Sequence, residues 1–137
     1  MVPWTDELPR RTPQMIVAAA IASAAISIAG PAPATLHGDL DAAAAYWQQS
    51  TPVRCSTETA AFAKLPGLVL GEATIPDPAV SAPCTMTIER GLSARLRCLT
   101  VVHEYGHWLG FHHSKNKLSP MYPIIGAGAV VPECDRA

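Results

Sequence analysis

The segment from His103 to His113 contains three histidines at a spacing that suits a metal ion. Residues four apart on a helix lie on one face, so His103 and His107 would present two imidazoles to the same ion. Gly110 can adopt a left-handed backbone conformation, which would let the chain reverse and bring His113 to that ion. Three protein ligands leave a fourth coordination position open, and this arrangement is typical of catalytic zinc.

Glu104 follows the first histidine in the sequence. Its side chain would leave the helix next to that of His103 and point toward a zinc-bound water and not toward the metal itself. Zinc lowers the pKa of such a water to about 7, and a carboxylate can take its proton and pass it to a leaving amine. The residues therefore predict hydrolysis of a peptide bond with Glu104 as general base. H-E-x-x-H alone is a weak pattern, whereas H-E-x-x-H-x-x-G-x-x-H fixes five identities.

Two other histidines of the chain are less suited to bind the metal. His112 neighbours His113, but the motif counts three residues beyond Gly110 and so favours His113. His112 would then face solvent or support a ligand, and His37, far away in the sequence, reads as a surface histidine. The competing interpretation of the whole segment is a set of solvated helical histidines without a metal.

A helix must carry the first two histidines. Helical periodicity runs from Ser93, a suitable N-cap, to about Leu109, and Gly110 would end the helix. The apolar stripe of this helix would consist of Leu96, Leu99, Val102 and Trp108.

An earlier helix is predicted from Asp39, as a possible cap, to Gln49, with an end near Ser50. Its apolar face would pack on a sheet and consists of Leu40, Ala43, Ala44 and Trp47.

Short strands are predicted between the helices, at 68–75 and 84–89, with a weaker candidate at 52–55. The proline-rich stretch 76–83 would be a loop. This order of elements predicts an α+β domain with a short mixed sheet packed on the N-terminal helix and the metal-binding helix.

The N-terminus has the layout of a secretory signal peptide. Arg10 and Arg11 precede an apolar run at 15–29, and Ala32-Pro33-Ala34 supplies an A-x-A-like cleavage site. We predict a signal peptide at 1–34, one mature domain at 35–137 and secretion. The alternative is a membrane anchor, although the run of roughly 15 residues is short against the ~20 that a bilayer requires. The formal net charge of −1, with both signs scattered, argues against a nucleic-acid partner.

Four cysteines in a small exported domain predict two disulfides. The sequence alone does not choose among the three possible pairings, of which we favour Cys98 with Cys134 and Cys55 with Cys84. A zinc cluster of cysteines is the rival interpretation, but the chain has no C-x-x-C pair.

The sequence resembles the metzincins, and among them most closely the matrixins, which are the matrix-metalloproteinase type. The resemblance rests on the residues from His103 to His113, on Ser114, and on Leu118-Ser119-Pro120-Met121-Tyr122-Pro123. It implies zinc in a shallow cleft and extended peptide substrates bound beside an edge strand. It also implies that Met121 forms the Met-turn beneath the histidines, and that Tyr122 and Pro123 border the pocket for the residue after the cut.

The chain also departs from the matrixin pattern. Val53-Arg54-Cys55 lacks the flanking residues of a cysteine switch, and the acidic residues are too few and dispersed for calcium loops, so zinc alone is expected. Only 14 residues follow Pro123, which leaves a short C-terminal tail.

The expected function is that of a secreted, monomeric zinc endopeptidase. Its partners would be protein or peptide substrates, without stable membrane association after signal cleavage. Two alternatives remain at this point: a secreted zinc-binding module without proteolytic activity, and a membrane-anchored peptidase.

Overall fold

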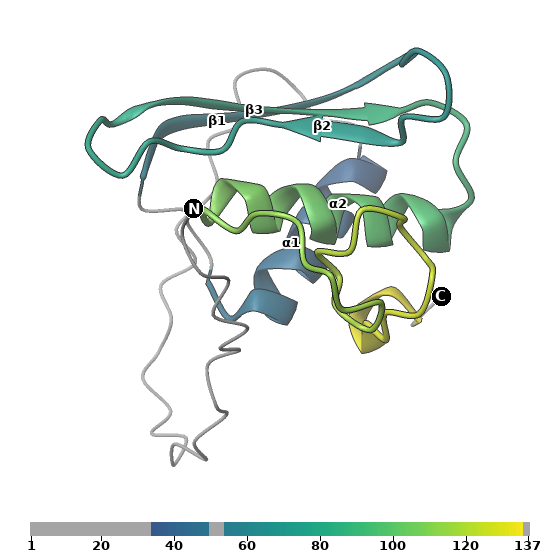
Figure 1. The fold of residues 1–137 in the computed structure, drawn as a ribbon. Helices are drawn as coiled ribbons and strands as arrows, with labels where there is room; N and C mark the ends of the chain where they lie inside the picture. The colour runs from purple at the N-terminus through teal and green to yellow at the C-terminus, as the bar shows by residue number, and fades with distance from the viewer. Residues whose placement is uncertain (1–33, 50–53, 136–137) are drawn as a thin grey trace, which may run out of the picture.

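The computed structural model describes residues 34–49 and 54–135. Figure 1 shows a sheet on one side of helix α2, with the loops that follow α2 on the other side. The elements in chain order are α1 (Ala34–Trp47), β1 (Cys55–Ala63), β2 (Gly71–Ala73), β3 (Ala82–Glu89), α2 (Ala94–Trp108) and the 3-10 turn η1 (Pro132–Cys134). The domain is therefore α+β, as the sequence predicts.

Helix α2 is the central element of the molecule. It begins after Ser93, whose hydroxyl accepts a hydrogen bond from the Leu96 N–H at 3.3 Å, and its C-cap is Leu109, so both predicted ends are confirmed. Every residue from Cys98 to Trp108 is buried. The predicted apolar stripe occupies one face of the helix, but α2 is covered by β2 and β3 on one side and by α1 and η1 on another. From Cys98 onward the helix is therefore buried all round, whereas Ala94 and Arg95 in its first turn are exposed.

The sheet has three strands in the order β1-β3-β2. Strand β3 runs parallel to β1, with Ala60 opposite Met86, and antiparallel to β2, with Ala73 opposite Met86. The predicted strand 68–75 is shortened to 71–73, and the predicted strand 84–89 begins two residues earlier, inside the expected loop. The weak candidate at 52–55 overlaps β1 only at Cys55, and 50–53 lie outside the described residues.

Helix α1 begins at Ala34, five residues before the predicted start. Asp39 is therefore not a cap: it lies inside the helix and its carboxylate pairs with the Arg97 guanidinium of α2. Leu40 and Ala43 are buried, but the main neighbours of α1 are α2 and η1 and not the sheet, which corrects the predicted packing.

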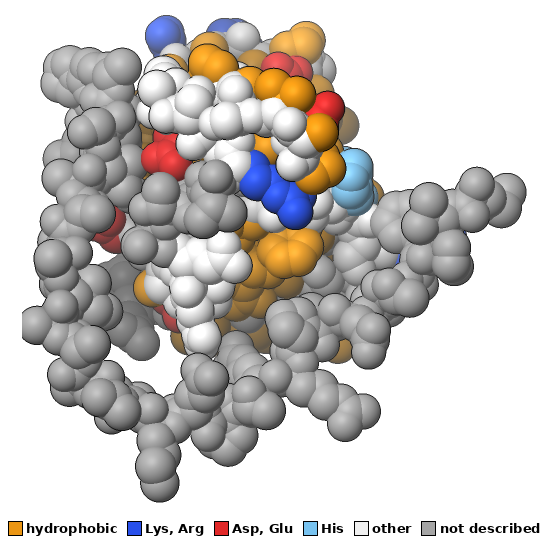
Figure 2. All heavy atoms as spheres, turned by 90° about the vertical axis from the view of Figure 1, so that its left-hand side faces the viewer, with side chains coloured by type: hydrophobic (Ala, Val, Ile, Leu, Met, Phe, Trp, Pro, Cys, Tyr) orange, Lys and Arg blue, Asp and Glu red, His pale blue; other side chains and the backbone are white. Residues whose placement is uncertain are grey.

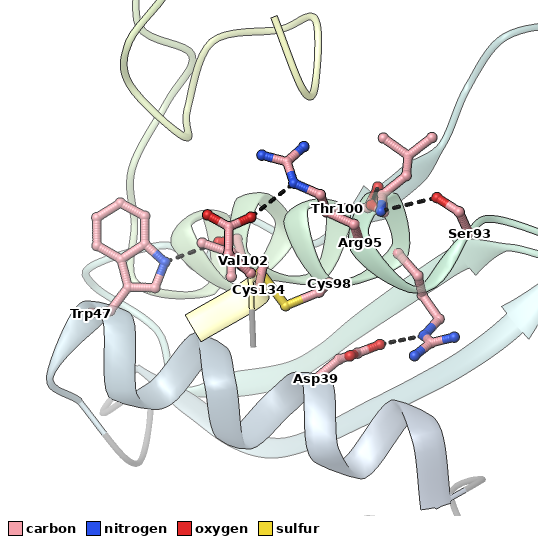
Figure 3. The surroundings of a disulfide bond; sticks show 11 residues. Asp39, Trp47, Ser93, Arg95, Cys98, Thr100, Val102 and Cys134 are labelled. Atoms are coloured by element: carbon pink, nitrogen blue, oxygen red, sulfur yellow. Dashed lines mark hydrogen bonds and ion pairs between the residues drawn. A yellow bond between two sulfur atoms is a disulfide. The ribbon is translucent and has the colours of Figure 1, made fainter. Parts of the chain in front are cut away.

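Two disulfides join elements that are distant in sequence. Cys55–Cys84 connects β1 to β3, and Cys98–Cys134 connects α2 to η1, as Figure 3 shows for the second bond. Both match the favoured pairing. The first bond links two strands within the sheet, and the second fixes the C-terminal turn to α2.

The predicted signal peptide lies outside the described residues except for Ala34, with which α1 begins. In the two described ranges, neither long helix has the length and apolar character that crossing a bilayer requires.

Candidate metal centre

The structure brings His103, His107 and His113 together. One ring nitrogen from each lies within 4.8 Å of those of the other two. The ring centroids form a nearly equilateral triangle, with separations of 4.9 Å, 5.0 Å and 5.1 Å. His103 and His107 lie on successive turns of α2 and are buried, whereas His113 follows the helix and is exposed. On the face toward which the C-terminal end of α2 points, Figure 2 shows histidine atoms reaching the surface.

The reversal after α2 explains how His113 returns to the helix. Gly110 has φ +94°, a conformation that side chains with a Cβ rarely adopt. The Gly110 N–H donates to the His107 carbonyl at 2.9 Å, and the Phe111 N–H donates to the Gly106 carbonyl at 3.0 Å. These bonds satisfy the last carbonyls of the helix and fix the direction in which the chain leaves it.

Backbone carbonyls orient the two buried rings. His103 Nδ1 lies 2.7 Å from the Pro120 carbonyl oxygen, and His107 Nδ1 lies 2.7 Å from the Phe111 carbonyl oxygen. A carbonyl can only accept, so each Nδ1 carries the proton and each Nε2 keeps a lone pair for a metal. Burial lowers the pKa of His103 to about 4 and lowers the pKa of His107 as well. Both rings are therefore neutral at pH 7, which metal binding requires.

Glu104 is buried beside the histidines, with 3% of its surface exposed. Burial raises its pKa to about 7, and the negative charge of Glu72 acts in the same direction. A Cβ on Gly71 of β2 would lie 2.7 Å from Glu104 Oε1 and 2.8 Å from Thr100 Cγ2. The edge strand can approach α2 this closely only because residue 71 has no side chain. A carboxyl group with this pKa can both accept and return a proton near neutral pH.

Met121 lies against α2 beside the histidines. It is 4% exposed, and a Cβ on Gly106 would lie 2.3 Å from its Sδ atom. The Ser114 N–H donates to the Met121 carbonyl at 2.9 Å, and the Ser119 hydroxyl accepts from the Met121 N–H at 3.1 Å. The residue predicted to support the site thus packs on the helix between two of the histidines.

The other predicted site residues are more peripheral. Tyr122 lines a small hollow together with Leu99 of α2 and Pro120, while Pro123 is exposed and is not part of that lining. His112 is exposed and does not belong to the triad. His37 is exposed on α1, where its Nε2 lies 3.9 Å from Asp41 Oδ2.

Sequence reasoning missed three residues at this centre. Gly71 and Gly106 allow close approach, and single glycines in a strand and in a helix gave no spacing signal. The sequence predicts Trp47 on an apolar helix face, but its Cζ2 atom would lie 3.0 Å from a Cβ on Gly106, the residue before His107. Only a fold that places the end of α1 against α2 reveals this contact.

Three imidazoles, two of them neutral and held by carbonyls, form a donor set that fits zinc. A family model described as Matrixin matches residues 32–133, a range that contains the whole triad and Met121. A search of curated proteins finds no match to the chain.

Proposed function

This chain belongs to the matrixin family, and on that premise we propose that it is a zinc-dependent endopeptidase. We assign His103, His107 and His113 as the zinc ligands and Glu104 as the general base. The observation that carries the proposal is the convergence of the three rings, with a buried carboxyl group on the neighbouring residue.

A bound zinc ion would supply a Lewis acid that polarises the scissile carbonyl and makes water more acidic. The Glu104 carboxylate takes a proton from the attacking water at an Oε atom and later delivers it to the leaving amine. Burial beneath the close approach of Gly71 keeps the carboxyl group in a dry environment, and that environment raises its pKa to about 7, in the range in which both transfers are efficient. The Pro120 and Phe111 carbonyls keep His103 and His107 in one tautomer.

The substrates are extended peptides that bind beside strand β2. This strand is an edge of the sheet, hydrogen-bonded to β3 on one side, and its Gly71 contacts the side chain of Glu104. An extended peptide can add to such an edge through main-chain hydrogen bonds. The scissile bond would then lie close to the general base.

We also propose that the protein is exported and acts as a monomer. The two disulfides are compatible with an oxidising compartment. N-terminal sequencing of the exported form tests the compartment: a start at Thr35 is expected, and a chain that retains residues 15–29 would indicate the anchored peptidase instead.

The test of catalysis compares three proteins on a quenched casein substrate with zinc present. The parent should cleave it, and Glu104→Ala should cleave at least ~10²-fold more slowly, because general acid–base catalysis typically contributes 10²–10⁴-fold. Asp41→Asn is the matched control, since it removes an exposed carboxylate on α1, and its rate should equal that of the parent. A parent without cleavage, or an undiminished rate in Glu104→Ala, overturns the proposal.

One observation favours the second candidate, a zinc module that does not cut. In the described range after Met121, the only regular element is η1 (Pro132–Cys134), so little regular structure is available there to hold a substrate. A non-cutting module would bind one zinc ion per chain yet leave every member of a peptide library intact. The buried Glu104 argues for the peptidase, because a purely structural zinc site has no use for it.

A further inference from the structure

We propose that Trp47, at the end of α1, is a positioning residue that holds the turn after α2 and thereby sets the geometry of the histidine triad. The proposal rests on the metal site assigned above. It concerns a residue at the end of α1, outside the 103–123 segment that contains the three histidines.

Trp47 makes three separate contacts with the segment that carries the histidines. Its Nε1–H donates to the Val102 carbonyl at 2.9 Å. Its ring stacks on Phe111, with 5.0 Å between the centroids and 25° between the planes. Its Cζ2 atom would lie 3.0 Å from a Cβ on Gly106. These contacts span the residue before His103, the residue before His107, and the turn that leads to His113; Figure 3 shows the first of them.

Phe111 connects this support to the metal ligands. Its carbonyl oxygen accepts the hydrogen bond from His107 Nδ1 at 2.7 Å. The residue whose ring stacks on Trp47 is therefore also the residue whose backbone orients His107. A displaced Phe111 would rotate or release that imidazole, because the carbonyl fixes both its tautomer and its direction.

His113 depends on the same turn. It is exposed, so burial does not hold its ring as it holds those of His103 and His107. It lies two residues beyond Phe111, and its position follows from the path of the chain there. Trp47 fixes one side of that path by covering a phenylalanine ring that is still 38% exposed.

The end of α1 is anchored well enough to act as a support. The Tyr105 hydroxyl donates to the Gln49 carbonyl at 2.8 Å, just beyond the helix end, and the Trp47 indole donates to Val102. Tryptophan suits this position because it combines a large flat apolar surface with one hydrogen-bond donor.

The experiment measures metal binding and metal geometry, and not peptidase activity. Zinc affinity is obtained by competition with a chromophoric chelator, and the visible spectrum of the Co²⁺-substituted protein reports the coordination geometry. Trp47→Leu removes both the stack and the donor, Trp47→Phe restores an aromatic ring, and Phe111→Ala removes the stack from its partly exposed side. Leu40→Ala is the matched control, since it truncates a buried side chain on the same helix, seven residues before Trp47.

We expect Trp47→Leu and Phe111→Ala to weaken zinc binding by about 10–100-fold, the effect typical of residues that orient metal ligands. Both should alter the Co²⁺ spectrum, and Trp47→Phe should recover most of the affinity. Leu40→Ala should lower thermal stability and leave affinity and spectrum unchanged. If Trp47→Leu does not fold, Phe111→Ala carries the test alone.

Unchanged affinity and spectrum in Trp47→Leu or Phe111→Ala overturn the proposal, as does an equal loss in Leu40→Ala. A parent protein that binds neither zinc nor Co²⁺ overturns both this proposal and the proposed function. A parent that binds zinc but cleaves no peptide overturns the proposed function and leaves the role of Trp47 to be decided by the affinities.

Discussion

At the residue scale, two glycines, which have no side chain, matter as much to the site as the imidazoles. Gly71 lets β2 reach Glu104, and Gly106 lets Met121 and Trp47 reach α2 between two of the histidines. Helical glycine is normally unfavourable by about 1 kcal/mol relative to alanine. At Gly106 this cost is outweighed by the packing that the missing Cβ permits.

Gly106→Ala should therefore destabilise the protein by about 1–3 kcal/mol, the usual effect of overpacking, because its Cβ would lie 2.3 Å from Sδ of the buried Met121 and 3.0 Å from the Trp47 ring atom Cζ2, so that both packed side chains would have to move. Gly38→Ala is the matched control in α1, where no atom lies within 4 Å of the new Cβ. It should stabilise the protein by about 0.5–1 kcal/mol. Urea unfolding of both variants measures the two effects, and changes of the same sign would show that helix propensity alone governs Gly106.

Glu89 supplies a pH dependence away from the metal site. The hydrogen bond from the Leu65 N–H to its carboxylate, helped by Lys64, lowers the pKa of Glu89 below its ordinary value of 4.5. A lowered folded-state pKa stabilises the protein above the unfolded value, and this contribution is lost as pH falls below 4.5. Glu89→Gln should thus be less stable than the parent at pH 7, with a gap that narrows at pH 3.5. A gap of constant size in urea unfolding at both pH values contradicts this.

At this scale, the sequence predicts the clustering of the three histidines better than it predicts the residues that make room for them. The triad and Gly110 were predicted because helix periodicity and a left-handed turn are local properties. Gly71 and Trp47 act on residues far away in the sequence, and no local pattern contains that information.

At the element scale, local signals decided which predictions succeed. Both ends of α2 were predicted, because each is marked by a residue next to it in the sequence. Ser93 caps the start with its side chain, and Gly110 adopts the left-handed backbone conformation after the end. The start of α1 was misplaced because Asp39 resembles a cap, whereas its real partner is Arg97, 58 residues later. Strand β1 was largely missed because of its sequence, C-S-T-E-T-A-A-F-A. It lacks the alternation of large apolar or β-branched residues with polar ones that is typical of a strand. Pairing with β3 and the Cys55–Cys84 bond stabilise β1 instead.

Removing either disulfide tests how far the elements depend on covalent links. The two bonds span 29 and 36 residues, and loop-closure entropy predicts a loss of about 3–4 kcal/mol of unfolding free energy for each. The double variants Cys55→Ala/Cys84→Ala and Cys98→Ala/Cys134→Ala should therefore be destabilised almost equally in urea unfolding. A loss below about 1 kcal/mol for either pair would mean that residual structure already restricts that part of the unfolded chain when the disulfide is absent.

At the scale of the whole molecule, α2 lies between the sheet and α1, and a single core crosses both interfaces. Leu40 of α1, Val101 of α2 and Ile88 of β3 all belong to this core. The α+β class was predictable from the order of elements. The strand order was not, because the parallel pairing of β1 with β3 joins segments that are distant in sequence.

A core that joins all layers, together with two disulfides, predicts a fold that does not require the metal. A chelator should abolish casein cleavage and lower the melting temperature while the far-ultraviolet circular dichroism persists. Zinc at 100 times its dissociation constant should restore about 2.7 kcal/mol of stability. Loss of the helical signal on chelation would instead make this a domain whose folding depends on the ion.

The three histidines come from eleven consecutive residues, whereas Cys134 lies 21 residues beyond the last of them. During synthesis from the N-terminus, the complete set of imidazoles emerges before the thiol that must join Cys98. Ion capture by the nascent chain can thus precede the final oxidation step, and an ion held at that stage would organise the C-terminal half of α2 before Cys98, in the first half of the same helix, is oxidised.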